Sequence, residues 1–213
     1  MENLLTNVLR SFGSAPFEGG ALAEALRGYD AVDIKLSRMV KNGELLRLKR
    51  GLYCVSPANL REGRRLLKGV IANRLYGPSY VSYETALAAY GLIPERVTVE
   101  RSAVCKASRS FETPIGLFEY FETAAELMPL GVRVERTEDG NYLMANPTKA
   151  LCDTLMRKRR LRVTSPKTLR DFLETDMRFD FDYFGEPDFE TLSGFVDYGV
   201  KPGLFKALER MFS

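Results

Sequence analysis

Apolar positions near the N-terminus first recur at helical spacing and then alternate with polar ones. The helical spacing predicts an amphipathic helix over residues 2–12, a second short helix that is stopped by Gly28, and a third over residues 31–42. Residues 45–55 then alternate apolar and basic side chains around a glycine-containing turn, which predicts a β-hairpin. Short helices followed by a hairpin with a basic tip are the order of a winged helix-turn-helix.

The third helix separates its side chains into two faces. Leu36 and Met39 lie on an apolar stripe that we expect to be buried, while Arg38 and Lys41 lie on the opposite, polar face. A helix-turn-helix places its second helix in the major groove of DNA, where an apolar residue such as Ile34 can contact a thymine methyl group. The predicted DNA-binding residues are Ile34, Lys35, Ser37, Arg38, Lys41, Arg47, Lys49 and Arg50.

The same pattern has a second interpretation. Winged helices also mediate protein–protein contacts, and basic side chains opposite an apolar stripe are common on solvated helices. Ile34 could equally pack on a neighbouring segment. In this alternative the N-terminal segment is a protein-interaction module that binds a partner directly instead of DNA.

Residues 57–213 are predicted to form a mixed α/β domain behind a first domain of residues 1–56, so the whole chain is expected to be α+β. Glu138-Asp139-Gly140 joins two apolar segments and predicts a hairpin. Ser82 is the expected cap of a short helix. The predicted helices cover residues 60–76 and 82–90, start at Pro147 and Ser165, and cover 188–197 and 203–212; the predicted strands cover 97–105, 116–121, 132–136 and 141–145.

The predicted helix over residues 60–76 carries a basic stripe opposite its apolar side. The stripe consists of Arg61, Arg64, Arg65 and Lys68. We interpret it either as a secondary contact for an anion or as a solvated face.

Positive charge is concentrated near the N-terminus, although the formal net charge is only +3. Residues 1–74 contain 13 basic and 7 acidic side chains, whereas residues 75–150 contain 7 and 10. A basic segment on a nearly neutral protein indicates a local site for a polyanion. A solvated surface that is rich in lysine and arginine would give the same counts.

Composition excludes several kinds of site. The 213-residue chain has no histidine, which excludes serine triads, Cys-His pairs and His-ligated zinc. Its three cysteines stand far apart without a CxxC pair, which argues against a thiolate zinc site and suits a reducing compartment. No secretory segment and no apolar run of about 18 residues is present, so we expect a cytoplasmic protein with no membrane span. No cofactor or metal is expected.

Two pairs of charged residues have a spacing that is typical of a known role, one pair of metal binding and the other of an ion pair along a helix. Asp180 and Asp182 are spaced like metal-binding carboxylates of nucleotidyl transfer, but the aromatic residues around them favour packing, and we predict that the protein is not an enzyme. Lys149 and Asp153 lie four residues apart on a predicted helix, where an ion pair contributes about 0.2–0.5 kcal/mol.

Three segments together resemble the antitoxin family of type IV toxin–antitoxin systems, the AbiEi-like proteins first known from phage abortive infection. The segments are residues 36–55, 76–95 and 145–155, which read LSRMVKNGELLRLKRGLYCV, YGPSYVSYETALAAYGLIPE and ANPTKALCDTL. In the third segment Asn146 and Thr148 stand where the family more usually has threonine and glutamate.

The resemblance implies a winged-helix DNA-binding domain that is joined to an antitoxin domain. It implies a transcriptional regulator that represses its own operon at an inverted-repeat operator in double-stranded DNA. It also implies opposition to a nucleotidyltransferase-like toxin, which type IV antitoxins are considered to counter without a stable complex. An inverted-repeat operator usually needs two DNA-binding units, so either a dimer or a pair of monomers is expected on DNA.

Overall fold

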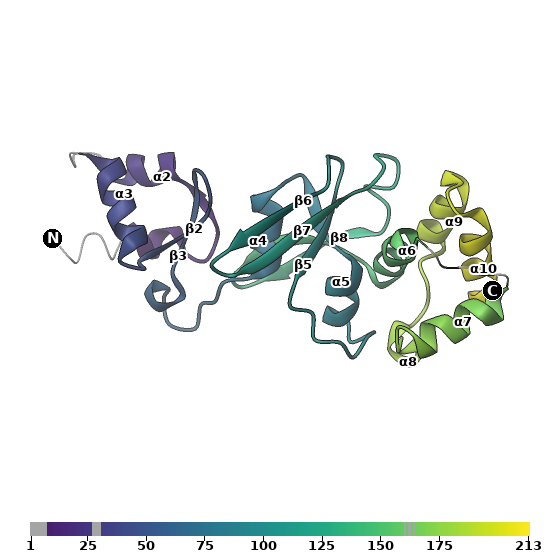
Figure 1. Cartoon of the computed structure of the whole chain (residues 1–213). Helices are drawn as coiled ribbons and strands as arrows, with labels where there is room; N and C mark the ends of the chain where they lie inside the picture. The colour runs from purple at the N-terminus through teal and green to yellow at the C-terminus, as the bar shows by residue number, and fades with distance from the viewer. Residues whose placement is uncertain (1–7, 27–30, 160, 162, 164) are drawn as a thin grey trace.

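The structure, a computed structural model, describes residues 8–26, 31–159, 161, 163 and 165–213. Figure 1 shows an extended arrangement, in which an N-terminal unit of helices and a hairpin, a central sheet and a group of C-terminal helices follow one another. Helices and strands are interspersed along the chain, which confirms the predicted α+β class.

The N-terminal unit packs short helices against a small antiparallel sheet. Residues 8–12 are helical, and the rest of the helix predicted over residues 2–12 lies outside the described residues. Helices α2 (Gly19–Ala25) and α3 (Val32–Lys41) follow, and α3 agrees with its prediction to within one residue at each end. The three strands, in the order β1-β3-β2, are β1 (Phe17–Glu18), β2 (Leu45–Lys49) and β3 (Leu52–Val55).

The N-terminal unit has a small apolar core of its own. Leu36 and Met39 of α3 are buried in this core as predicted, and Val32 and Val40 pack at its margin. Phe17 joins them from β1, a strand too short to produce an alternating sequence pattern. The buried stripe fixes the rotation of α3, so its polar face must point away from the core.

A mixed six-stranded sheet forms the centre of the molecule, with the strand order β6-β7-β5-β4-β9-β8. Strand β4 pairs in parallel with β9, as β5 does with β7, and the other neighbours are antiparallel. The hairpin predicted around Glu138-Asp139 is confirmed, whereas the strand predicted over residues 97–105 is shorter. The strands are β4 (Ser79–Val81), β5 (Glu100–Val104), β6 (Arg109–Thr113), β7 (Gly116–Glu122), β8 (Val132–Thr137) and β9 (Gly140–Ala145).

Helices flank the sheet and build the C-terminal end of the molecule (Figure 1). Two of them begin where the sequence predicts, each behind a capping side chain: the Asn146 side chain accepts a hydrogen bond from the Lys149 backbone N–H at 2.8 Å, and Ser165 with Thr168 forms a capping box. The helices are α4 (Lys68–Leu75), α5 (Tyr83–Ala89), α6 (Pro147–Arg157), α7 (Pro166–Thr175), α8 (Phe181–Phe184), α9 (Phe189–Tyr198) and α10 (Pro202–Phe212).

The helix predicted over residues 60–76 is wrong in its first half. The chain forms a 3₁₀ turn (Pro57–Asn59) and then an irregular segment, and α4 begins only at Lys68. Gly63 has a left-handed backbone with φ 78°, which interrupts any helical run at this position. The irregular segment instead connects the N-terminal unit to the sheet.

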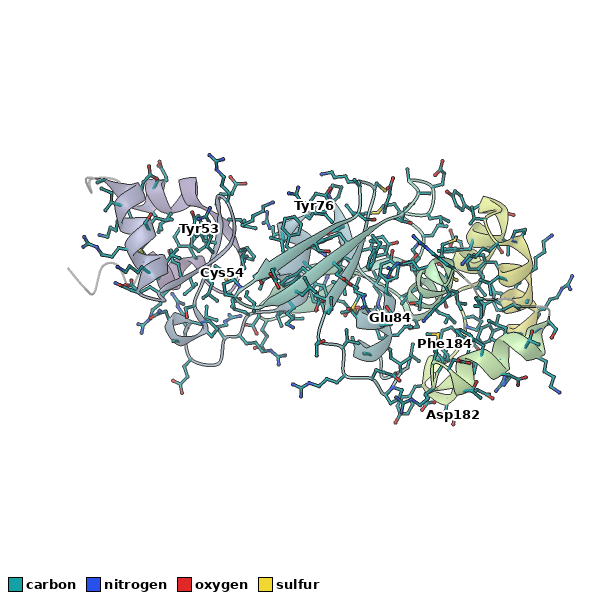
Figure 2. The ribbon with its side chains drawn as sticks, viewed as in Figure 1. Tyr53, Cys54, Tyr76, Glu84, Asp182 and Phe184 are labelled. Carbon is teal, nitrogen blue, oxygen red and sulfur yellow. The ribbon has the colours of Figure 1, made fainter. Side chains whose placement is uncertain are left out.

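The β2–β3 hairpin belongs to two apolar cores. Tyr53 and Val55 pack into the core of the N-terminal unit, whereas Leu52 and Cys54 of the same strand pack into the core of the rest of the chain. Successive side chains of a strand point to opposite faces, so one strand connects both cores, and Figure 2 shows Tyr53 and Cys54 at this junction. The domain boundary predicted at residue 56 directly follows this shared hairpin and stays a prediction.

The Lys149–Asp153 pair lies in the interior, where the sequence predicted an ordinary pair along a helix. The Lys149 Nζ is 3.3 Å from the Asp153 Oδ1 and donates to the Leu127 carbonyl at 2.8 Å. The hydroxyls of Tyr80 and Ser82 donate to the Asp153 Oδ2 at 3.0 and 2.7 Å. Ser82 therefore uses its hydroxyl here and makes no side-chain cap to α5, which corrects its predicted role. Burial raises the pKa of Asp153, and the Lys149 ammonium opposes this shift.

Candidate nucleic-acid interface

The polar face of α3 is exposed along its length. Ile34 is 64% exposed, and Ser37, Arg38 and Lys41 are exposed as well. Lys35, on the flank of the same helix, is half-buried. The face therefore offers two cations, a hydroxyl and an apolar side chain, which together can contact phosphates, base edges and thymine methyl groups.

Nothing in the described part of the chain covers this face. Figure 1 shows α3 in the N-terminal unit, with the β2–β3 hairpin between it and the six-stranded sheet. Among the residues that the structure describes, no carboxylate forms an ion pair with Arg38 or Lys41. Both lie in the last turn of α3, where positive charge also favours the negative end of the helix dipole.

The three basic residues of the hairpin differ in whether their charged groups already have a partner in the chain. Arg47 is exposed on β2, and Arg50 is exposed at the turn, where Gly51 has a φ of 80°. The Lys49 Nζ instead donates to the Leu75 carbonyl at the end of α4, at 2.7 Å. Lys49 thus has a partner within the chain, and its amine holds the hairpin against the end of α4.

The basic stripe predicted for Arg61, Arg64, Arg65 and Lys68 does not form, because only Lys68 belongs to a helix. Arg64 donates to the Glu138 carbonyl, and its Nη1 lies 3.6 Å from the Asp139 Oδ1. The Arg65 Nε lies 3.7 Å from the Asp139 Oδ2.

The other two residues of the predicted stripe, Arg61 and Lys68, lie in different environments. Arg61 is exposed. Lys68 lies close enough to Glu100 to act on it: burial raises the pKa of Glu100 to about 7, and the Lys68 charge opposes this shift. Arg61 and Arg64 line one surface pocket, whereas Lys68 lies elsewhere near Glu100, and the secondary contact for an anion stays a prediction.

Asp139 fastens the connecting segment to the sheet, and this arrangement can be tested. Its backbone carbonyl also accepts from the Ser14 hydroxyl at 2.7 Å. We expect Asp139→Ala to lower the free energy of unfolding by about 1 kcal/mol, because Arg64 and Arg65 lose a shielded acceptor. Urea unfolding followed by circular dichroism measures the change. Glu138→Ala is the control, because Arg64 uses only the Glu138 carbonyl; an equal loss of stability in the two variants would contradict this role of the Asp139 carboxylate.

Of the Asp180–Asp182 pair, Asp180 has a structural role, and the Asp182 side chain is exposed. The Asp180 Oδ1 accepts from the backbone N–H of Asp182 at 2.9 Å and of Tyr183 at 3.3 Å, which caps α8. Phe179 and Phe184 pack beside it, and Figure 2 shows Asp182 and Phe184 in this region. Within the described ranges, no group of three His, Cys, Asp or Glu residues could hold a metal ion. None of the described helices is long and apolar enough to span a bilayer.

Comparison with known proteins connects this region to a family. Residues 22–56 match the family described as "Transcriptional regulator, AbiEi antitoxin". The match includes α3, the β2–β3 hairpin and all eight predicted DNA-binding residues. No curated protein matches the chain. The resemblance seen in the sequence is thereby confirmed for its first segment, which is similar to antitoxins that act as transcriptional regulators.

Proposed function

From the match of its helix-and-hairpin segment to AbiEi antitoxin regulators, we propose that this protein is a winged-helix repressor that binds operator DNA in its own promoter. We further propose that it is the antitoxin of a type IV toxin–antitoxin system and acts in the cytoplasm. In this proposal residues 57–213 oppose a nucleotidyltransferase-like toxin. The observation that carries the proposal is the uncovered basic face of α3.

The side chains on α3 suggest how bases and phosphates are contacted. Arg38 and Lys41 are long enough to reach guanine acceptors or phosphates when α3 lies in the major groove. Ser37 can donate to either, and the exposed Ile34 side chain suits a thymine methyl group. Each specific base contact of this kind contributes about 1–3 kcal/mol.

The hairpin supplies contacts beside α3. Arg47 and Arg50 are exposed and can lie along the phosphates that border the groove. One face of the hairpin packs on the central core, and Lys49 is bonded to the end of α4, so the position of these arginines relative to the sheet is fixed. A fixed hairpin lowers the entropy that DNA binding must remove.

The salt dependence of binding tests this proposal. With Arg38, Lys41, Arg47 and Arg50 at phosphates, the logarithm of the association constant should fall against the logarithm of salt concentration with a slope of about −3 to −4 for each bound chain. Arg47→Ala should reduce the magnitude of that slope by about 1. Fluorescence anisotropy with the duplex that lies upstream of the coding sequence measures both, and a slope near zero would contradict the proposal.

A further inference from the structure

Strand β8 forms an open edge of the central sheet. The opposite edge strand, β6, lies against β2 of the N-terminal unit. Just before β8, the Gly131 carbonyl accepts a hydrogen bond from the Asn146 N–H at 2.7 Å. The backbone N–H and C=O of Gly131 are therefore directed toward β9. Backbone groups alternate in direction along an antiparallel strand. Val132, Val134 and Arg136 therefore direct their N–H and C=O groups away from β9 and outward.

This edge lacks two of the features that usually prevent strands from pairing. Natural edge strands are protected by proline, by bulges and by charged side chains, and of these β8 has only the charges, which are of both signs. β8 reads VRVERT, without proline, and its register with β9 runs unshifted from Val132 to Thr137. Its central residue, Val134, is 50% exposed and lies opposite Leu143, which is 37% exposed. The edge thus presents backbone groups without a partner among the described residues, beside an exposed apolar pair.

The charges on β8 select one partner and one register. Arg133 and Glu135 flank Val134, and the Arg133 Nε lies 2.8 Å from the Glu135 Oε1. An antiparallel two-fold axis at Val134 places Arg133 opposite Glu135 of a second copy, and the reverse. An axis at Arg133, Glu135 or Arg136 would instead place two like charges opposite each other, which is destabilising.

We propose that two copies of this chain pair through β8, antiparallel and centred on Val134. The outward N–H and C=O of Val134 then bond to those of its mate, and Val132 lies opposite Arg136, whose backbone groups also point outward. Two valines and two leucines meet on one face, and two reciprocal Arg133–Glu135 pairs form on the other. The two central sheets become one continuous sheet.

The pairing is self-complementary, as a two-fold dimer interface must be. It does not depend on the proposed function, although it would also supply the two DNA-binding units that an inverted repeat needs. A measurement without DNA therefore tests the dimer alone, and its failure would leave the DNA-binding proposal standing.

Charge reversal on the full-length chain tests the register. Sedimentation equilibrium should give the wild type twice the 24.0 kDa chain mass. Arg133→Glu and Glu135→Arg should each sediment at the single-chain mass, because each puts two like-charge pairs into the interface. An equimolar mixture of the two variants should regain the doubled mass, because every cross-strand pair is then opposite in sign. This regain also shows that both variants are folded.

Val134→Pro tests the backbone contacts. Proline removes the outward N–H of residue 134 and no N–H of the ladder with β9, and edge strands tolerate proline at such positions, so the variant should keep its circular dichroism spectrum and sediment as a single chain. Lys206→Glu on α10, an exposed site with the same change in charge, is the control and should stay dimeric. The proposal is overturned by a wild type of single-chain mass throughout the concentration series. It is equally overturned by a dimer that survives Arg133→Glu and Val134→Pro, or by a mixture that stays at the single-chain mass.

Discussion

Replacing Arg38 and Lys41 together with alanine is expected to weaken binding to the upstream operator by about 2–6 kcal/mol, if each side chain contributes about 1–3 kcal/mol. At about 1.4 kcal/mol per factor of ten, this is a loss of affinity of about 30-fold to 10⁴-fold. Both side chains are exposed on α3 and do not support its core, so the fold should be unaffected. Fluorescence anisotropy measures the affinity, and thermal unfolding checks the fold.

A matched control separates this effect from a general loss of charge. Lys206 and Arg210 are exposed on α10, and replacing both with alanine also removes two positive charges. This control should bind the operator like the wild type. Equal losses in the two double variants would contradict the assignment of α3 as the DNA-binding element.

The second large effect is expected at the buried ion pair. Asp153→Ala should lower the free energy of unfolding by about 3–5 kcal/mol, because it leaves the Lys149 ammonium buried without a counter-charge. It also removes the acceptor of the Tyr80 and Ser82 hydroxyls. The Lys149 Nζ keeps the Leu127 carbonyl and lies 4.5 Å from the centre of the Phe195 ring, which replace a carboxylate only in part. Urea unfolding followed by circular dichroism measures the change.

Two further variants sharpen this test. Asp197→Ala on the exposed side of α9 removes the same charge and should change the free energy of unfolding by less than about 0.5 kcal/mol. Lys149→Met combined with Asp153→Leu should be more stable than Asp153→Ala, because no unpaired charge remains in the interior. A small effect of Asp153→Ala would show that water reaches the pair.

Sequence patterning succeeds where the determining contacts are local. The spacing of Leu36 and Met39 alone fixes which face of α3 is buried, and so which face carries Arg38 and Lys41. A glycine turn and alternating side chains determine the β2–β3 hairpin in the same way. These local patterns supplied the candidate site.

Patterning fails where partners are distant in the chain. Lys49 bonds to a carbonyl 26 residues away, and Arg64 to one 74 residues away. Neither partner is marked by its residue type, since both acceptors are backbone carbonyls. The basic residues after position 60 therefore resemble a charged helix in sequence, although Gly63 and the acceptors on the sheet hold them in an irregular connection.

Burial of a charged pair is equally hard to predict. Lys149 and Asp153 have the spacing of a solvated pair along a helix, and their sequence neighbours do not distinguish the two cases. Segments before and after α6 enclose them, among them Tyr80 on β4 and Phe195 on α9. Only the tertiary arrangement reveals that this pair holds several elements together.

The most direct test of the central claim, that the exposed face of α3 reads base sequence, is a ratio of two affinities. Binding to the upstream duplex and to a shuffled duplex of equal length should be measured at one salt concentration, for the wild type and for the Arg38→Ala/Lys41→Ala variant. The wild type should prefer the upstream duplex by about 10³-fold or more. This preference should largely disappear in the variant. A wild-type ratio near one, or the same ratio in both proteins, would contradict the claim.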